Sequence, residues 1–287
     1  MKLLLYFVRG LVFCYRLNTL RLARLVFKAV SGPVLLKRRF LQSRIVLDVS
    51  RSNTQELLWL QGVRFIQERF ILARLVRPGM SIVDVGANIG YYALLFVSHL
   101  RGVGKIVCLE PEPTNLIELR ANVAENQLEN LVEVLPVAAG NFDGMAKLEP
   151  GLNGLVVSRG SLEVPIWRID SMNLGRVDLM KIDVEGFEGA VLDGATATIE
   201  RDRPTLFLEL HPQLLTYHTH SQLLMFLRRY YQRITAFQEN RKGLVKKALA
   251  NYGLADSVCQ IDDLDSMITT YDAGMASDTC WLVAQSN

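Results

Sequence analysis

The feature that most restricts the fold of this chain is a strand that runs through a glycine-rich turn into a helix. It occupies residues 82–90, with the sequence IVDVGANIG, and its turn contains Gly86, Asn88 and Gly90. Glycine allows a ligand to approach the backbone closely, and the N-terminus of a helix presents N–H groups that have no partner within the helix. We therefore interpret this turn as a binding loop at the carboxyl end of a buried strand.

An acidic residue at the end of the next apolar run extends this interpretation. Glu110 follows the run KIVCL and lies 24 residues after Gly86. A carboxylate at this place in an α/β sheet can accept hydrogen bonds from both hydroxyls of a ribose. A dinucleotide site would have the spacing GxGxxG, whereas Asn88 replaces the middle glycine here, which suits a ligand without a pyrophosphate. The combination indicates a nucleoside pocket and favours S-adenosylmethionine over a purely structural turn.

Strands that alternate with helices predict an α/β fold with a mostly parallel sheet. Apolar runs and helical periodicity predict strands at 82–85, 105–109, 131–137, 177–184 and 205–210, and helices at 89–100, 115–128, 188–200 and 221–231. Two further strands, at 232–237 and 280–284, would close one edge. Residues 141–170 read as a β insertion. The polar segment 239–279 is either a lid or an ordinary surface insertion.

Four titratable residues follow two of the predicted strands. The segments KIDVEGFE and LFLELH place Asp183, Glu185, Glu209 and His211 at or just beyond strand ends. Ligands of open α/β sheets bind at the carboxyl ends of the strands, so these side chains should border one pocket. His211 can act as a general base near neutral pH. A hydrogen-bonded pair at the end of a strand is the alternative for Glu209 and His211.

Together these segments resemble the FkbM-type family of S-adenosylmethionine-dependent methyltransferases. The resemblance rests on VDVGANIGYYALL, LEPEP, Asn122, DLMKIDVEGFEGAVLDGA and RPTLFLELH, from about Gly79 to His211. It implies a class I methyltransferase (Rossmann-like) fold, with a seven-stranded sheet that is parallel except for its last strand and has helices on both faces. It also implies O-methylation, often of sugar hydroxyls in glycans, glycolipids or natural products.

Within this framework each candidate residue has an expected role. The cofactor would be held by Gly86, Asn88, Gly90 and Glu110 at its adenosine end, by Ala138 near the adenine, and by Asp84 near the methionine part. Asp183, Glu185, Glu209 and His211 would border the methyl acceptor, with His211 as the preferred base. We assign no metal ligands, although a divalent cation held by the carboxylates is an alternative that we do not favour.

The N-terminal region, residues 1–50, differs in character from the body at 51–287. The first 47 residues carry ten Lys and Arg and no acid, while the rest of the chain carries 22 bases and 29 acids. Residues 1–30 predict a basic amphipathic helix whose apolar runs are too short to span a bilayer. We expect a cytoplasmic protein that this helix attaches peripherally to an anionic membrane. A helix packed on its own body or on a second subunit is the alternative, and a homo-oligomer remains open.

Absent motifs narrow the chemistry further. The chain has no [DN]PP[YF] run to hold an exocyclic amine and no Pro-Cys pair to attack a pyrimidine. A hydroxyl on a small molecule, a glycan or a lipid-linked substrate is therefore the expected acceptor. An RNA methyltransferase with a basic arm is less favoured, because the N-terminal region is as apolar as it is basic and the rest of the chain has a net negative charge. A non-catalytic membrane-binding protein that retains the fold is the third alternative. The four cysteines are expected to be free thiols.

Overall fold

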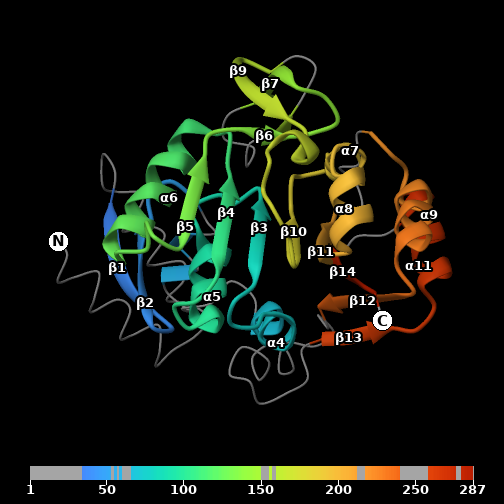
Figure 1. Ribbon diagram of the computed structural model, residues 1–287, viewed down its shortest axis with the longest axis horizontal. Coiled ribbons are helices and arrows are strands. Elements are labelled where there is room, and N and C mark those ends of the chain that lie inside the picture. Colours follow the sequence, from blue (N-terminus) through green and yellow to red (C-terminus); the bar gives the residue numbers. More distant parts are fainter. Residues whose placement is uncertain are drawn as a thin grey trace. The chain divides into compact units, whose positions relative to one another are not determined.

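The computed structural model describes residues 34–52, 55–56, 58–59, 66–149, 155–156, 160–211, 217–239, 258–275 and 279–286. Figure 1 shows their helices and strands. The chain divides into two compact units, Met1–Phe65 and Ile66–Asn287. This division falls later in the chain than the boundary expected at residue 50. The predicted N-terminal helix at 1–30 lies outside the described residues, so it stays a prediction.

The described part of the first unit contains an antiparallel hairpin of β1 (Leu35–Phe40) and β2 (Ser43–Asp48). Its two-residue connection begins at Leu41, which has a positive φ of 55°. The Asp48 carboxylate accepts hydrogen bonds from the backbone N–H groups of Val34 (3.0 Å) and Ser50 (3.1 Å) and so holds the open end of the hairpin.

The second unit is built on a central sheet whose strand order is β13-β12-β14-β11-β10-β3-β4-β5. Neighbouring strands from β11 to β5 are parallel, whereas β14 is antiparallel to both β11 and β12, and β13 is antiparallel to β12. The bounds are β3 Ser81–Val85, β4 Lys105–Leu109, β5 Val132–Leu135, β10 Leu179–Ile182, β11 Thr205–Leu210, β12 Arg233–Glu239, β13 Val258–Ile261 and β14 Cys280–Gln285. The predicted α/β architecture with a mostly parallel sheet is confirmed.

This sheet has eight strands in the described residues, one more than the seven expected. The additional strand is β13, which pairs with β12 at the sheet edge and precedes helix α11 (Leu264–Asp272). Both elements lie within the polar segment 239–279, so part of that segment is regular structure attached to the sheet. Residues 240–257 and 276–278 lie outside the described residues, and the lid stays a prediction.

Helices pack on both faces of the sheet. The α-helices described in this unit are α4 Ile66–Leu75, α5 Tyr91–Leu100, α6 Pro113–Glu125, α7 Glu188–Asp193, α8 Thr196–Asp202, α9 His220–Tyr230 and α11. Val83, Met180 and Leu208 lie in one buried apolar cluster with residues of α7, α8, α9 and α11. Side chains alternate along a strand, so the residue next to each of these three on its own strand faces the opposite side of the sheet. On that side the Tyr92 ring of α5 lies 6.3 Å from the ring of Phe207, the neighbour of Leu208.

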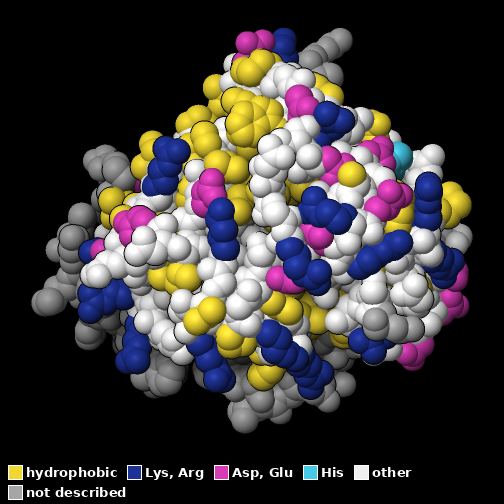
Figure 2. Space-filling model, viewed as in Figure 1, with side chains coloured by type: hydrophobic (Ala, Val, Ile, Leu, Met, Phe, Trp, Pro, Cys, Tyr) yellow, Lys and Arg dark blue, Asp and Glu magenta, His cyan; other side chains and the backbone are white. Residues whose placement is uncertain are grey.

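A second, smaller sheet follows β5 in the chain. It contains β6 (Ala138–Ala139), β7 (Gly144–Glu149), β8 (Leu155–Val156) and β9 (Leu162–Trp167) in the order β6-β9-β7-β8, which confirms the predicted β insertion. Its inner face forms its own buried cluster, against which Phe187 packs. Figure 2 shows hydrophobic side chains gathered over this sheet at the top of the view, and Phe142, Met145 and Trp167 are among the exposed ones.

None of the helices in the described part of the chain combines the length and the apolar character that crossing a bilayer requires.

Candidate functional site

Gly86 directly follows β3 and lies against the ends of the two neighbouring strands, β4 and β10. Its φ is +73°, and a Cβ atom there would lie 2.0 Å from the backbone oxygen of Asp183, just beyond β10. The N–H groups of Gly86 and Ala87 both donate to the Leu109 carbonyl at the end of β4, at 3.0 Å. A side chain at Gly86 would therefore separate the turn from the segment that carries Asp183.

The rest of the turn is held by side chains from α6 and from the turn itself. Asn88 has a φ of 50°, and its side-chain oxygen accepts a hydrogen bond from the Ile89 N–H at 2.9 Å. The Asn122 amide donates to the Ile89 carbonyl at 2.8 Å. Gly90, with a φ of 88°, then begins α5 without a side-chain cap. The positive end of the α5 helix dipole therefore lies at this turn, where it favours an anionic group.

Glu110 closes the other side of this turn. One carboxylate oxygen accepts from the Asn88 N–H at 2.7 Å, and the other accepts from the Glu112 N–H (3.0 Å) and the Asn115 amide (3.2 Å). Only 2 % of Glu110 is exposed. Burial raises its pKa to about 7, against the opposing effect of these three donors. Glu110 therefore lies directly against the glycine turn, whereas its predicted contact with the cofactor is not tested by these bonds.

These residues fit a nucleoside linked to an amino acid. The Glu110 oxygen that faces the turn accepts one hydrogen bond from the described residues, which leaves it a further lone pair for a ribose hydroxyl. The uncapped start of α5 can receive a carboxylate. The fit places Gly86, Asn88, Gly90 and Glu110 in one cradle. Their contact with S-adenosylmethionine itself remains a prediction.

Asp84 is fully buried and forms an ion pair with Lys181, in which Oδ1 lies 3.2 Å from Nζ. Burial outweighs the attraction of the Lys181 ammonium and raises the pKa of Asp84. Burial also opposes the charge on Lys181, but the carboxylates of Asp84 and Asp183 outweigh it and raise the pKa of Lys181. Asp84, two residues before Gly86, is thus part of a buried ion pair, and its expected place beside the methionine part of the cofactor stays a prediction.

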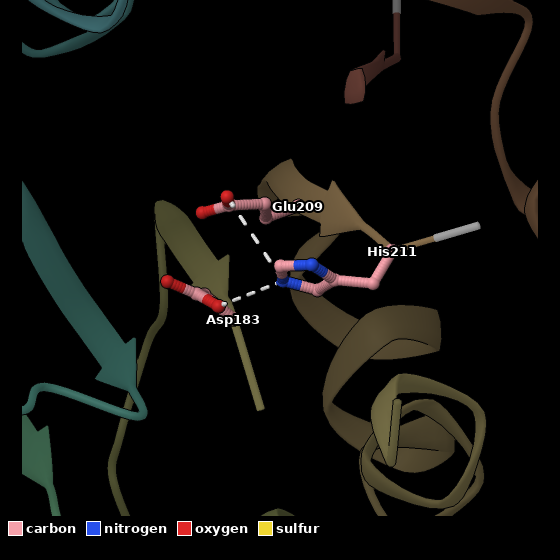
Figure 3. A group of neighbouring side chains, drawn as sticks. All are labelled: Asp183, Glu209 and His211. Carbon is pink, nitrogen blue, oxygen red and sulfur yellow. Dashed lines mark ion pairs between the residues drawn. The ribbon is translucent and has the colours of Figure 1, made fainter. Parts of the chain in front are cut away.

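The four residues predicted to converge do lie together. The His211 Nε2 atom is 3.6 Å from Asp183 Oδ1, 3.6 Å from Glu185 Oε2 and 3.9 Å from Glu209 Oε1. Figure 3 shows Asp183 and Glu209 directed toward the imidazole from neighbouring strand ends. Burial favours the neutral ring, but Asp183, Glu209 and Glu185 outweigh it and raise the pKa of His211 to about 9. The imidazole therefore carries a proton at neutral pH.

Glu188 lies next to this acid–histidine cluster, which we define as Asp183, Glu185, Glu209 and His211. It is the first residue of α7, and one of its oxygens accepts from the N–H groups of Gly186 (3.1 Å) and Val184 (3.3 Å). Burial raises its pKa to about 7. An acid at this first helical position is favoured by the helix dipole, and the hydrogen bonds of Glu188 hold the loop that carries Glu185.

The cluster also has the composition of a metal site. Ligand atoms of Asp183, Glu209 and His211 all lie within 4.8 Å of one another. Carboxylate and imidazole donors at such separations could bind a divalent cation, so this alternative stays open.

The other two histidines of this region have separate partners. His218 lies 3.1 Å from Asp193, whereas the imidazole of His220 lies 3.1 Å from Asp272. Each imidazole is thus paired with its own carboxylate on a different helix, an arrangement that favours structural roles.

Some of the site's residues were assigned no role by the sequence. One of them is Lys181, which forms the buried ion pair with Asp84. The available signal was a lysine in the apolar strand LMKI, at the register position of the acid in IVDV. Asn115, which binds Glu110, carried no signal. Ala138 is buried in β6 opposite Ile166, and its place near the adenine stays a prediction.

A parallel sheet of this order, a glycine turn after β3 and an acid after β4 define a methyltransferase-like α/β protein. A family profile described as "Methyltransferase FkbM domain" matches residues 84–234, slightly more than half of the chain. The chain therefore belongs to the FkbM methyltransferase family, whose methyl donor is S-adenosylmethionine. This confirms the resemblance of the sequence motifs.

Solved structures similar to this chain include the methyltransferase FkbM from Methylobacillus flagellatus KT, at 19 % identity and a TM-score of 0.38. That alignment covers 54 % of this chain and 44 % of the FkbM structure, less than half of its length. The precorrin-6y C5,15-methyltransferase from Geobacter metallireducens GS-15 aligns at 11 % identity over 85 % of this chain and 94 % of its own, with a TM-score of 0.43. A putative rRNA methylase from Clostridium thermocellum aligns at 9 % identity over 77 % and 94 %, with a TM-score of 0.46. No curated protein sequence matches significantly.

Proposed function

We propose that this protein transfers a methyl group from S-adenosylmethionine to a hydroxyl of a glycan, glycolipid or related small molecule. The observation that carries the proposal is the acid–histidine cluster next to the cofactor turn. The backbone of Asp183 lies against Gly86, and its side chain belongs to the cluster. Groups able to accept a proton thus lie beside the place where the donor would bind.

The chain's own residues have three tasks in such a reaction. S-adenosylmethionine, when bound, supplies an electrophilic methyl group on a sulfonium. The Gly86–Gly90 turn and Glu110 hold and orient the donor. The acid–histidine cluster orients the acceptor hydroxyl, and the neutral fraction of His211 accepts its proton as the methyl group passes from the sulfur to the oxygen. Positioning of this kind supplies much of the rate in group transfer between two bound reactants.

The proton on His211 gives this proposal a pH signature. With a pKa of about 9, about one imidazole in a hundred is neutral at pH 7. If neutral His211 is the base, kcat/KM should rise about tenfold per pH unit below 9. If Asp183 or Glu209 is the base and His211 only its cationic partner, activity should instead fall as His211 loses its proton.

Two features support an acceptor with an apolar part at a membrane surface. The small sheet, which packs on Phe187 next to the cluster, exposes Phe142, Met145 and Trp167 (Figure 2). The second feature is the basic amphipathic pattern of residues 1–30, which would attach the enzyme peripherally to anionic lipid. Both favour a lipid-linked acceptor over a free polar one.

The test is transfer of labelled methyl from S-adenosylmethionine into separate lipid, glycan and RNA extracts. We expect label in the lipid or glycan extract, and the label should resist mild base, which releases methyl esters but leaves ethers. The His211→Gln variant should lose transfer while it still binds S-adenosylmethionine. Label confined to RNA would refute the proposed acceptor, and absence of donor binding would refute the enzyme altogether.

A further inference from the structure

Two charged side chains stand next to each other on the sheet face beneath α5. Register pairing aligns Cys108 of β4, Asp84 of β3, Lys181 of β10 and Phe207 of β11 in one row across the sheet. Lys181 is 1 % exposed and Asp84 is fully buried. A buried ion pair is often no more stabilising than apolar residues of the same size, so stability alone is a poor reason for it.

The contacts of the Lys181 ammonium point to a different reason. Nζ donates to the backbone oxygens of Gly86 (2.7 Å) and Val85 (3.2 Å), which form the start of the cofactor turn. It pairs with Asp84 at 3.2 Å and lies 4.7 Å from the centre of the Tyr92 ring. It also lies 3.8 Å from Oδ2 of Asp183, whose other oxygen faces His211.

The peptide groups of the turn are thus held from two directions. On one side the Gly86 N–H donates to Leu109 of β4, and on the other its carbonyl accepts from Lys181 of β10. The same ammonium attracts the side chain of Asp183, and the backbone of Asp183 contacts Gly86. A movement of Asp183 would therefore change the forces on the turn, and a movement of the turn would change those on Asp183.

We propose that Lys181 is a positioning residue that couples the donor-binding turn to the acid–histidine cluster, through the bonds of its ammonium to the Val85 and Gly86 carbonyls and its pairing with Asp183. The coupling is reciprocal, so a change at Asp183 alters donor affinity through Lys181. This inference concerns donor binding and is independent of the identity of the acceptor.

The experiment measures the dissociation constants of S-adenosylmethionine and S-adenosylhomocysteine by calorimetry, with urea unfolding run in parallel. Lys181→Met keeps the length of the side chain but leaves Asp84 charged and buried. The double variant Asp84→Asn, Lys181→Met removes both charges together, so neither member of the pair is left buried and charged without the other. Lys105→Met is the matched control, since Lys105 pairs with Glu133 at the surface.

We expect the folded double variant to bind S-adenosylmethionine at least tenfold more weakly, and Lys105→Met to bind as the wild type does. Wild-type affinity in the folded double variant would reduce Lys181 to a structural role and overturn the proposal.

A double-mutant cycle tests the coupling itself. Asp183→Asn should change donor affinity several-fold when Lys181 is present, and should have little effect in the Lys181→Met background. Equal effects in the two backgrounds would overturn the coupling. If the Lys181 variants do not fold, Asp183→Asn alone decides, because unchanged donor affinity in that variant contradicts the proposed link.

Discussion

The pKa of Glu110 leads to a quantitative prediction for donor binding. If Glu110 binds the ribose as predicted, both of its oxygens are strong acceptors only when the carboxylate is ionised, yet burial raises its pKa to about 7 in the ligand-free protein. Only the ionised fraction of the protein then binds well, so the apparent dissociation constant equals the intrinsic constant divided by that fraction. Binding should weaken about tenfold between pH 8 and pH 6, since the ionised fraction falls from about nine-tenths to about one-tenth.

The raised pKa of Glu110 also affects the stability of the ligand-free protein, but in the opposite direction with pH. Because the folded-state pKa lies above the unfolded value of 4.5, Glu110 favours folding below pH 4.5, and that contribution is lost as pH rises to 7. The difference corresponds to roughly 3 kcal/mol. Donor binding gains affinity in the range where the ligand-free fold loses this stability.

Calorimetric titration with S-adenosylhomocysteine from pH 5.5 to 8.5 tests the prediction. Glu110→Gln keeps the shape of the side chain but lacks the charge, so we expect binding weaker by about 1.5–3 kcal/mol, with this pH dependence removed. Glu188→Gln is the control, because Glu188 has a similarly raised pKa but binds the loop after β10 rather than the turn. A pH dependence that persists in Glu110→Gln would refute the reasoning.

Three further predictions address the turn, the cluster and the N-terminal region. Gly86→Ala should abolish donor binding, measured by calorimetry, because the new Cβ would overlap the backbone oxygen of Asp183. Gly102→Ala is the control: Gly102 also has a positive φ, +81°, but open space around it, so this variant should lose only about 1–2 kcal/mol of folding stability. His211 contributes stability that is fully present below pH 6.5 and is lost as pH rises through 9, so urea midpoints of wild type and His211→Gln should differ most below pH 6.5. Full-length protein should float with anionic liposomes, less so in high salt, and deletion of residues 1–30 should abolish flotation, whereas equal flotation of the truncated protein would contradict membrane attachment.

Local sequence signals predicted the central elements well. The strands 105–109 and 205–210 have the predicted bounds because each is an apolar run set off by Gly104 or Pro204. The helix predicted at 188–200 is instead two helices, α7 and α8, interrupted after Asp193. Apolar periodicity continues across the break, but a Cβ at Gly194 would meet the Gly140 carbonyl at 1.8 Å. That contact depends on the small sheet and is invisible to a local pattern.

The site shows the same division between local and long-range information. The convergence of Asp183, Glu209 and His211 was predictable because the carboxyl ends of parallel strands meet at one edge of a sheet. The Asp84–Lys181 pair was not, because it requires that β3 and β10, about 95 residues apart in the chain, be neighbours in the sheet. Strand β13 was missed for a related reason, since a four-residue edge strand within a polar segment carries little hydrophobic signal.

The row of residues beneath α5 also contains a cysteine, whose reactivity toward a methyl donor depends on its protonation. A sulfonium methyl is an electrophile that any nearby thiolate would attack. Cys108 occupies the register position next to Asp84, only two residues before Glu110, and is completely buried. Burial, together with the charges of Asp84 and Glu110, holds the pKa of Cys108 well above its usual value. Cys108 is therefore kept as a buried, protonated thiol, which is a poor nucleophile toward a sulfonium methyl.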